Sequence, residues 1–344
     1  MKKKSAIFAS ALAAAGMTLV TAFMAAPSPA DAASPADAVP TAKARIAAHF
    51  DLSRGQLPEN IALEPDGTAD VTFAKARQVA TVSPEGRTRI LATMPNPADG
   101  GVKTPALGFA LTTGIVRAHD GTLYFLYASG TSDLTGLWRL RPGGTPHRIA
   151  ALPADGLPNG LALDERHDRL YAADSVKGAI YTVPTRGGEA STWSAAPELA
   201  AKGFLGVNGL KIHKGALWAT NLDQGTVLRV PFGHTGRPGP VQTRATGLVG
   251  IDDFAFTGKG DEIVAALNSP NEVVRIRRDG TSSTVLNAAD GLQNPTSVAL
   301  RHGRLYVLSA AYTTAADPNL LLARLPRSPQ AQAQAQAQTQ TQGQ

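Results

Sequence analysis

Three short patterns of apolar and polar residues each recur six times along the chain. The first is an apolar run that often contains Leu-Tyr or Leu-Trp, and the second alternates apolar and polar residues before Pro or Gly. Alternation with a period of two is typical of half-buried β-strands. The first pattern lies at 68–74, 122–128, 169–174, 216–221, 262–267 and 304–309, and the second at 78–82, 136–140, 179–183, 226–230, 273–276 and 321–325.

The third pattern precedes the first in every repeat. Six copies of a three- to four-stranded unit predict an all-β fold, a six-bladed β-propeller. A solenoid is the alternative, but six repeats followed by a stop favour a closed ring. Residues 45–50 and 320–325 are both candidates for the strand that closes it. The six copies begin with Pro58-Glu59-Asn60, Thr112-Thr113-Gly114, Pro158-Asn159-Gly160, Val207-Asn208-Gly209, Ile251-Asp252-Asp253 and Pro295-Thr296-Ser297.

The two ends of the chain differ from this repeat. Lys2 to Lys4, an apolar run and Ala30-Asp31-Ala32 predict a signal peptide over residues 1–32, with a membrane anchor as the alternative. We expect a linker at 33–44, the propeller at 45–328 and a disordered Gln/Ala-rich tail at 329–344. The mature protein would then begin near Ala33 and be secreted, without a membrane segment.

Composition excludes several classes of function. The 344 residues include no cysteine, which rules out disulfides, thiolate metal sites and a cysteine nucleophile. The net charge of +6 falls to +4 without the signal peptide, and the basic residues are scattered, so no nucleic-acid partner is expected. We expect a monomer that acts on a small molecule.

The third pattern is the candidate for the innermost strand of each blade, which lines the central channel of a propeller. Residues at its second position would then stand around one axis. All six carry side-chain oxygen, and oxygen ligands of mixed charge suit a hard cation, above all Ca²⁺. Turns at the Asn-Gly pairs, and a solvated Asp-Asp loop, are the alternative reading. The six residues are Glu59, Thr113, Asn159, Asn208, Asp252 and Thr296.

The set Glu59, Asn159, Asn208 and Asp252, together with the stretches 157–164 and 170–175, resembles the SMP-30/gluconolactonase-like family over about residues 50–326. The resemblance implies that these four residues bind Ca²⁺, or another divalent cation such as Zn²⁺, Mn²⁺ or Mg²⁺. It also implies metal-assisted hydrolysis of a lactone or related ester, with Asp252 as general base. The chain departs from the sugar lactonases of that family beside Glu59, at Val207 and at Asp252-Asp253, which makes it a divergent member.

Substrate contacts are expected from Thr113, Thr296, Asp253 and His213. His213 lies just past an inner-strand pattern, and a surface or packing role is its alternative. The sequence contains no nucleophile-elbow motif, no H-E-x-x-H motif and no phosphate-binding glycine loop, which disfavours a serine hydrolase and a nucleotide enzyme. Two other functions stay open: a binding propeller without chemistry, and a strictosidine-synthase-like or cyclase activity on a hydrophobic metabolite. A channel entrance lined by Phe and Leu would favour the last of these.

Overall fold

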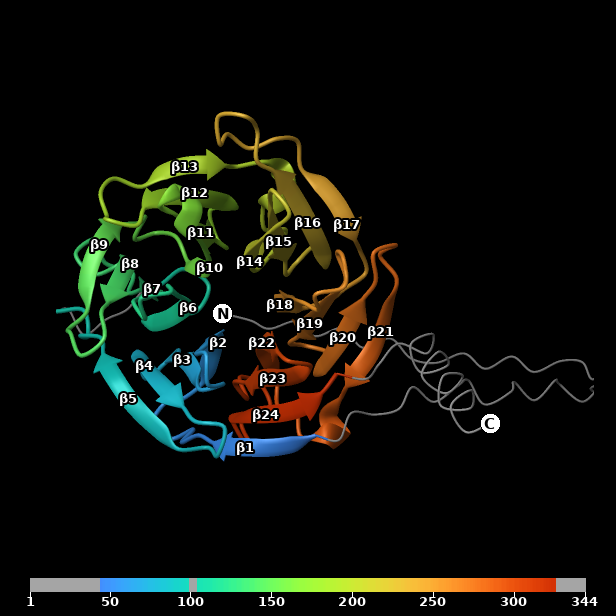
Figure 1. Ribbon diagram of the computed structural model, residues 1–344. Coiled ribbons are helices and arrows are strands. Elements are labelled where there is room, and N and C mark those ends of the chain that lie inside the picture. Colours follow the sequence, from blue (N-terminus) through green and yellow to red (C-terminus); the bar gives the residue numbers. More distant parts are fainter. Residues whose placement is uncertain (1–43, 99–103, 326–344) are drawn as a thin grey trace, which may run out of the picture. The chain divides into compact units, whose positions relative to one another are not determined.

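The computed structural model describes residues 44–98 and 104–325, which form six four-stranded antiparallel sheets arranged in a ring (Figure 1). The prediction of a six-bladed β-propeller is confirmed, and the solenoid is excluded. The predicted signal peptide, the linker up to residue 43 and the tail at 329–344 lie outside the described residues. Within the described part, no helix is long and apolar enough to cross a membrane.

The third sequence pattern forms the innermost strand of every blade, as predicted. Each of these strands contacts its counterparts in the two neighbouring blades, and contact between the first and last of them closes the ring. Their bounds are β2 (Pro58–Leu63), β6 (Leu111–Arg117), β10 (Pro158–Asp164), β14 (Val207–His213), β18 (Ile251–Phe256) and β22 (Pro295–Arg301).

The other two patterns form the second and third strands of the blades. The second strands are buried along nearly their whole length because sheets cover both of their faces, which explains why they are apolar runs rather than alternating ones. The second strands are β3 (Ala69–Phe73), β7 (Leu123–Ala128), β11 (Arg169–Asp174), β15 (Ala216–Asn221), β19 (Ile263–Leu267) and β23 (Arg304–Ser309). The third strands are β4 (Gln78–Val82), β8 (Gly136–Leu140), β12 (Ala179–Pro184), β16 (Thr226–Pro231), β20 (Glu272–Ile276) and β24 (Asn319–Arg324).

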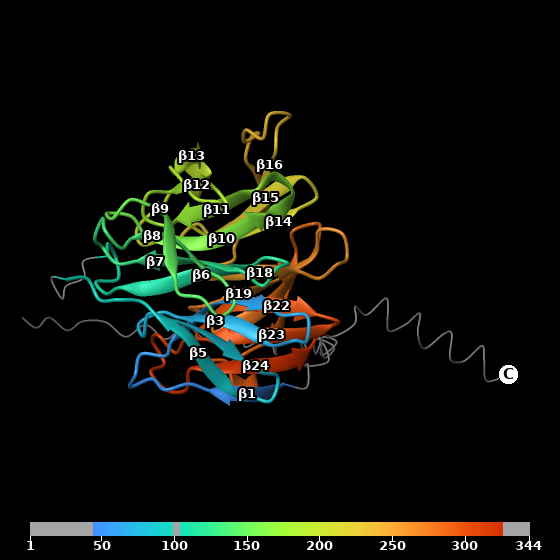
Figure 2. The same cartoon turned by 60° about the vertical axis from the view of Figure 1, so that its left-hand side comes forward.

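Outer strands complete the blades and are largely exposed. In the last blade the outer strand comes from the N-terminal side of the chain: β1 (Arg45–His49) pairs with β24, beside which it lies in both views (Figures 1 and 2). Both closing candidates therefore belong to one sheet. The remaining outer strands are β5 (Thr88–Thr93), β9 (His147–Ala151), β13 (Ser191–Ser194), β17 (Gln242–Ala245) and β21 (Ser282–Leu286); short 3₁₀ helices cover Glu165–His167, Pro197–Leu199 and Ala288–Asp290.

Candidate functional site

The candidate site is built on an irregularity shared by all six inner strands. In β10, Pro158 pairs with Asp174 and Leu161 pairs with Ala172. The register thus shifts by one residue, which is a β-bulge with one extra residue in β10. The same shift occurs at the start of the other five inner strands. An extra residue of this kind bends a strand and re-aims its side chains. The residues at the second position of the sequence pattern lie in these bulges.

Glycine in the bulge lets neighbouring inner strands approach closely. A Cβ atom at Gly160 would lie 1.9 Å from the carbonyl oxygen of Asn208, and one at Gly209 would lie 2.4 Å from Asp253 Oδ1. The Asn-Gly pairs are therefore parts of strands β10 and β14, not hairpin turns. Their glycines narrow the channel where the polar side chains gather.

The two threonines of the set tie neighbouring blades together. The Thr113 hydroxyl donates to the carbonyl of Pro158 (2.8 Å), and the Thr296 hydroxyl donates to the carbonyl of Pro58 (2.9 Å) across the ring closure. Both threonines are fully buried. Their hydroxyls are already bonded, so the substrate contact expected of them stays a prediction.

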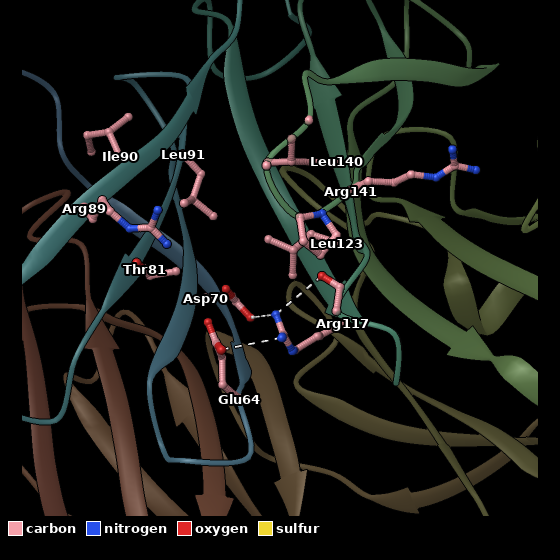
Figure 3. A pocket seen from close by; sticks show the side chains of 14 residues that line it. Glu64, Asp70, Thr81, Arg89, Ile90, Leu91, Arg117, Leu123, Leu140 and Arg141 are labelled. Carbon is pink, nitrogen blue, oxygen red and sulfur yellow. Dashed lines mark hydrogen bonds and ion pairs between the residues drawn. The ribbon is translucent and has the colours of Figure 1, made fainter.

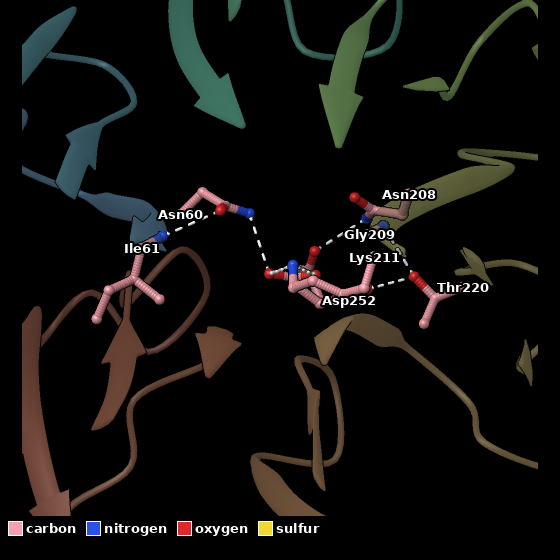
Figure 4. A network of polar contacts seen from close by, with 8 residues as sticks. Asn60, Ile61, Asn208, Gly209, Lys211, Thr220 and Asp252 are labelled. Carbon is pink, nitrogen blue, oxygen red and sulfur yellow. Dashed lines mark hydrogen bonds and ion pairs between the residues drawn. The ribbon is translucent and has the colours of Figure 1, made fainter. Parts of the chain in front are cut away.

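The two asparagines turn their amide nitrogens toward other side chains. Asn208 Nδ2 donates to Asp252 Oδ1 (2.9 Å), and Asn159 Nδ2 donates to Ser175 Oγ (3.2 Å). The amide oxygen of Asn208 points away from Asp252 (Figure 4). Ser175 in turn donates to the carbonyl of Val207 in the next blade, which holds Asn159 in place. This orientation leaves both amide oxygens as acceptors.

Glu59 lies on the opposite side of the set from Asn208 and is held by a residue that sequence reasoning missed. The Tyr312 hydroxyl donates to Glu59 Oε2 (2.5 Å). Burial raises the pKa of Glu59 to about 7, with a further rise from Asp253, while the bond from Tyr312 acts against the rise. Tyr312 lies 253 residues away from Glu59, in the segment between β23 and β24, so no motif around Glu59 could reveal it.

Like Glu59, Asp252 has no ion-pair partner among the described residues. Its pKa is raised well above the usual value by burial and then by the charges of Glu59 and Asp253, against the lowering effect of the Asn208 bond. The exposed fractions of Glu59 and Asp252 are 8% and 7%. The charges of these two buried carboxylates thus oppose each other, and the amide of Asn208 lies against one of them. Carboxylate and amide oxygens together are a donor set that fits a hard divalent cation.

The fit rests on the amides as much as on the carboxylates. Among residues 44–98 and 104–325, no three His, Cys, Asp or Glu side chains form a group that could hold a metal by themselves. Glu59, Asn159, Asn208 and Asp252 are the residues that would hold the cation. The choice of Ca²⁺ over Zn²⁺, Mn²⁺ or Mg²⁺ stays a prediction.

A second polar layer lies next to Asp252 and contains its own cation. Lys211 Nζ donates to both carboxylate oxygens of Asp253 at 2.6 and 2.8 Å, and Asn60 Nδ2 donates to Asp253 Oδ2 at 3.3 Å (Figure 4). These residues belong to β14, β18 and β2, so the layer joins three blades. Asp253 is 1% exposed and fully bonded, and its expected contact with substrate stays a prediction.

Lys211 was not recognised from the sequence, although a signal was present. Its position in the inner strand is occupied in the other five blades by small or β-branched apolar residues. A lysine that interrupts this series on a channel-lining strand is the feature that could have revealed the second layer. The five counterparts are Ala62, Val116, Ala162, Ala255 and Ala299.

His213 does not join the set. It lies five residues beyond Asn208 on β14, roughly 16 Å along the strand. Its ring stacks on Phe256 with centroids 3.9 Å apart, and its Nε2 donates to the carbonyl of Gly260 (2.7 Å). This placement gives no support to the substrate contact proposed for His213 and agrees with the packing role that was its alternative.

A cluster of mostly buried apolar side chains lies next to the residues of the set, at the start of the inner strands. Leu57, Leu111, Leu157 and Leu205 each precede a residue of the set by two or three positions and belong to one cluster, against which Tyr312 also packs. Two of the three exposed large hydrophobic side chains in the described residues precede β14 and β18 here. They are Phe204, 50% exposed, and Val249, 68% exposed.

The fold is similar to those of several solved structures. They include a gluconolactonase from Xanthomonas campestris (15% identity, 84% of this chain and 91% of that chain, TM-score 0.61) and a calcium-binding regucalcin from Agrobacterium tumefaciens (17%, 82% and 96%, TM-score 0.59). A virginiamycin B lyase from Staphylococcus aureus is also similar (13%, 83% and 99%, TM-score 0.53).

The sequence matches no protein-family model, and no curated protein is significantly similar to it. At these identities the similarity shows the fold alone. The resemblance expected from the sequence is confirmed at that level, because the structural neighbours include a regucalcin and a gluconolactonase, and the chain is a six-bladed propeller similar to both.

Proposed function

We propose that the protein is a hydrolase of a lactone or related ester, with a divalent cation held by Glu59, Asn159, Asn208 and Asp252. One observation supports this most directly: Glu59 and Asp252 are buried, the charge of Glu59 raises the pKa of Asp252, and neither has an ion-pair partner among the described residues. Structural similarity to a gluconolactonase and to a calcium-binding regucalcin agrees with it.

A bound cation would polarise the carbonyl of the substrate. Asp252 is the general base in this proposal: its carboxylate takes a proton from water as the water oxygen bonds to the carbonyl carbon. The ester C–O bond then breaks, and the proton passes to the leaving alkoxide oxygen. Asn208 fixes Asp252 Oδ1, and Tyr312 fixes Glu59, so neither carboxylate needs to reorient.

Metal analysis and a turnover screen test this proposal. Purified protein is assayed with lactones, aryl esters and phosphotriesters, with and without a chelator. We expect activity that disappears in chelator, returns with Ca²⁺, and is lost in Asp252→Asn. Asp279→Asn, an exposed aspartate in the turn after β20, is the matched control and should keep full activity. Full lactonase activity in Asp252→Asn would refute the general-base role.

A second candidate is a strictosidine-synthase-like or cyclase activity on a hydrophobic metabolite. The exposed apolar side chains of Phe204 and Val249, which precede β14 and β18, favour it. Mass spectrometry of products separates the two: hydrolysis adds one water to the substrate, whereas cyclisation by rearrangement keeps its mass.

A binding propeller without chemistry is the third candidate. The cation would then link the blades, and Asp252 would serve only as a ligand. Protein that is stabilised by Ca²⁺ but turns over none of the compounds in the screen would support this function over hydrolysis.

We also propose that the protein is exported and cleaved near Ala32. The support is the leader pattern of residues 1–32, which lies outside the described residues. Expression of the full chain in a secreting host, followed by N-terminal sequencing of the protein in the medium, should find Ala33 as the first residue. An intact N-terminus in the membrane fraction would instead show an anchor.

A further inference from the structure

We call the contact between two neighbouring blades a seam. At five of the six seams, an apolar side chain near the start of the second strand of one blade packs with an apolar side chain near the end of the inner strand of the next blade. The inner-strand residue is the sixth of the pattern that begins, for example, at Pro58, and the second-strand residues are equivalent in register. In five seams both residues are apolar and lie in the same hydrophobic cluster. These pairs are Tyr124 with Leu163, Tyr171 with Ile212, Trp218 with Phe256, Val264 with Leu300 and Tyr306 with Leu63.

The seam between the first and second blades replaces this apolar pair with charges. Register places Asp70 where the other blades have Tyr, Trp or Val, and Arg117 where they have Leu, Ile or Phe. Arg117 Nη1 donates to Asp70 Oδ2 at 3.2 Å, and Arg117 Nη2 lies 3.4 Å from Glu64 Oε2 (Figure 3). The Asp70 side chain is completely buried.

Stability alone does not explain this replacement. A buried ion pair is often no more stabilising than well-packed apolar residues of similar volume. In addition, Asp70 Oδ1 is buried and has no hydrogen-bond partner among the described residues. Burial raises the pKa of Asp70 to about 7, followed by the charge of Glu64, while Arg117 acts against the rise. The described residues therefore leave the Oδ1 atom of Asp70 without a hydrogen-bond donor.

A cavity of about 380 Å³ opens beside these residues, between the two blades. Asp70, Glu64 and Arg117 lie on its inner side, and the Arg89 guanidinium of β5 points toward Thr81 and Asp70 (Figure 3). Ile90, Leu91, Leu123 and Leu140 add an apolar wall. Arg117 ends β6, four residues beyond Thr113, so the cavity lies at the other end of the inner strands from Glu59 and Asp252.

We propose that this cavity is a second ligand site, for a small 2-hydroxycarboxylate that carries a hydrophobic group. Each part of such a ligand has a partner on the walls. The carboxylate pairs with the Arg89 guanidinium, whose planar donors suit carboxylates. The hydroxyl donates to Asp70 Oδ1, and the hydrophobic group packs against Ile90, Leu91, Leu123 and Leu140. The proposal does not depend on the activity of the channel.

Isothermal titration calorimetry with four probes tests the proposed ligand class. Mandelate has all three parts, phenylacetate lacks the hydroxyl, 1-phenylethane-1,2-diol lacks the carboxylate, and lactate lacks the aromatic group. We expect mandelate to bind about tenfold or more tightly than each of the other three. Absence of mandelate binding, or equal binding of all four, overturns the proposal.

Variants test the position of the site. The double variant Asp70→Tyr with Arg117→Leu installs a pair found in two other seams, so it should fold with an unchanged or higher Tm and lose mandelate binding. Arg89→Met should weaken binding about tenfold or more and provides the test if the double variant fails to fold. Arg186→Ala, an exposed arginine after β12, is the control and should bind normally.

The two sites can be separated in the same samples. We expect the double variant to keep whatever Ca²⁺ response and turnover the wild-type protein shows, because neither replaced residue touches Glu59 or Asp252. Retained mandelate binding in a folded double variant would refute the proposed site, while leaving the proposed hydrolase function untouched.

Discussion

Asp252 and Asp253 are adjacent in sequence and both buried, yet their carboxylates have different hydrogen-bond and ion-pair partners. Asp253 receives Lys211 at 2.6 Å and an amide from Asn60. Within the described part of the chain, the Asp252 side chain receives a hydrogen bond from the amide of Asn208 alone, and the charges of Glu59 and Asp253 raise its pKa. Lys211 therefore balances the charge of Asp253. At Asp252 a cation from solution would take that role and complete the proposed site.

The largest effect should come from removing the internal cation. Lys211→Met leaves Asp253 buried and unpaired, which should lower the free energy of unfolding by about 3 to 5 kcal/mol, measured by urea denaturation. Lys214→Met, at an exposed ion pair with Asp261, should cost less than about 1 kcal/mol. Adding Asp253→Asn to Lys211→Met should restore most of the loss; no restoration would mean that the lysine acts through packing.

The next effect concerns the cation from solution. Free Ca²⁺ at a hundredfold excess over its Kd should stabilise the protein by about 2.7 kcal/mol, read from thermal unfolding with and without chelator. Glu59→Gln with Asp252→Asn should abolish this response, whereas Asp253→Asn should keep it. A response that survives the first double variant would place the cation elsewhere.

In chelator, stability should depend on pH. The pKa of Glu59 is about 7 in the folded chain and lower when unfolded, so the folded state binds more protons between pH 4.5 and pH 7. The free energy of unfolding should therefore fall by roughly 2 kcal/mol as pH rises from 5 to 8. The pKa values of Asp252 and Asp70 are also raised, so Glu59→Gln should reduce this dependence without abolishing it, and an unchanged slope in that variant would assign the whole dependence to other groups.

The smallest effect should come from Tyr312→Phe. The variant removes one hydrogen bond to Glu59 and should cost about 1 kcal/mol in chelator. Because that bond lowers the pKa of Glu59, its loss should move the pH dependence upward. Tyr306→Phe, which alters a tyrosine without a bond to Glu59, is the control and should leave the pH dependence unchanged.

Much of this architecture could be read from the repeats. Apolar runs and alternation located the inner, second and third strands to within two residues. Burial on both faces makes the second strands apolar throughout, and burial on one face makes others alternate. Apart from β1, the outer strands, such as β13 (Ser191–Ser194) and β17 (Gln242–Ala245), were not located. They are short and exposed, so burial leaves little pattern in their sequence.

The sequence predicted only those residues of the candidate site that lie within the repeat. Register brought Glu59, Asn159, Asn208 and Asp252 to equivalent strand positions. Tyr312 reaches Glu59 from a segment outside the repeat, so no alignment of blades contains it. Asp70 could have been found: Leu-Tyr or Leu-Trp recurs in four blades, and the first blade has Ala69-Asp70 at that place. The cavity beside Asp70 is therefore marked by a departure from the repeat and not by the repeat itself.

The pairing of β1 with β24 has a consequence for biosynthesis. Arg45 lies opposite Leu322, so the earliest described strand to leave the ribosome finds its sheet partner only when nearly all of the chain has been made. Until then the unpaired backbone N–H and C=O groups of β1 can form hydrogen bonds with a non-native strand. Such a distant pairing is a slow step. Truncation before residue 319 would remove β24 and leave β1 without a strand to pair with.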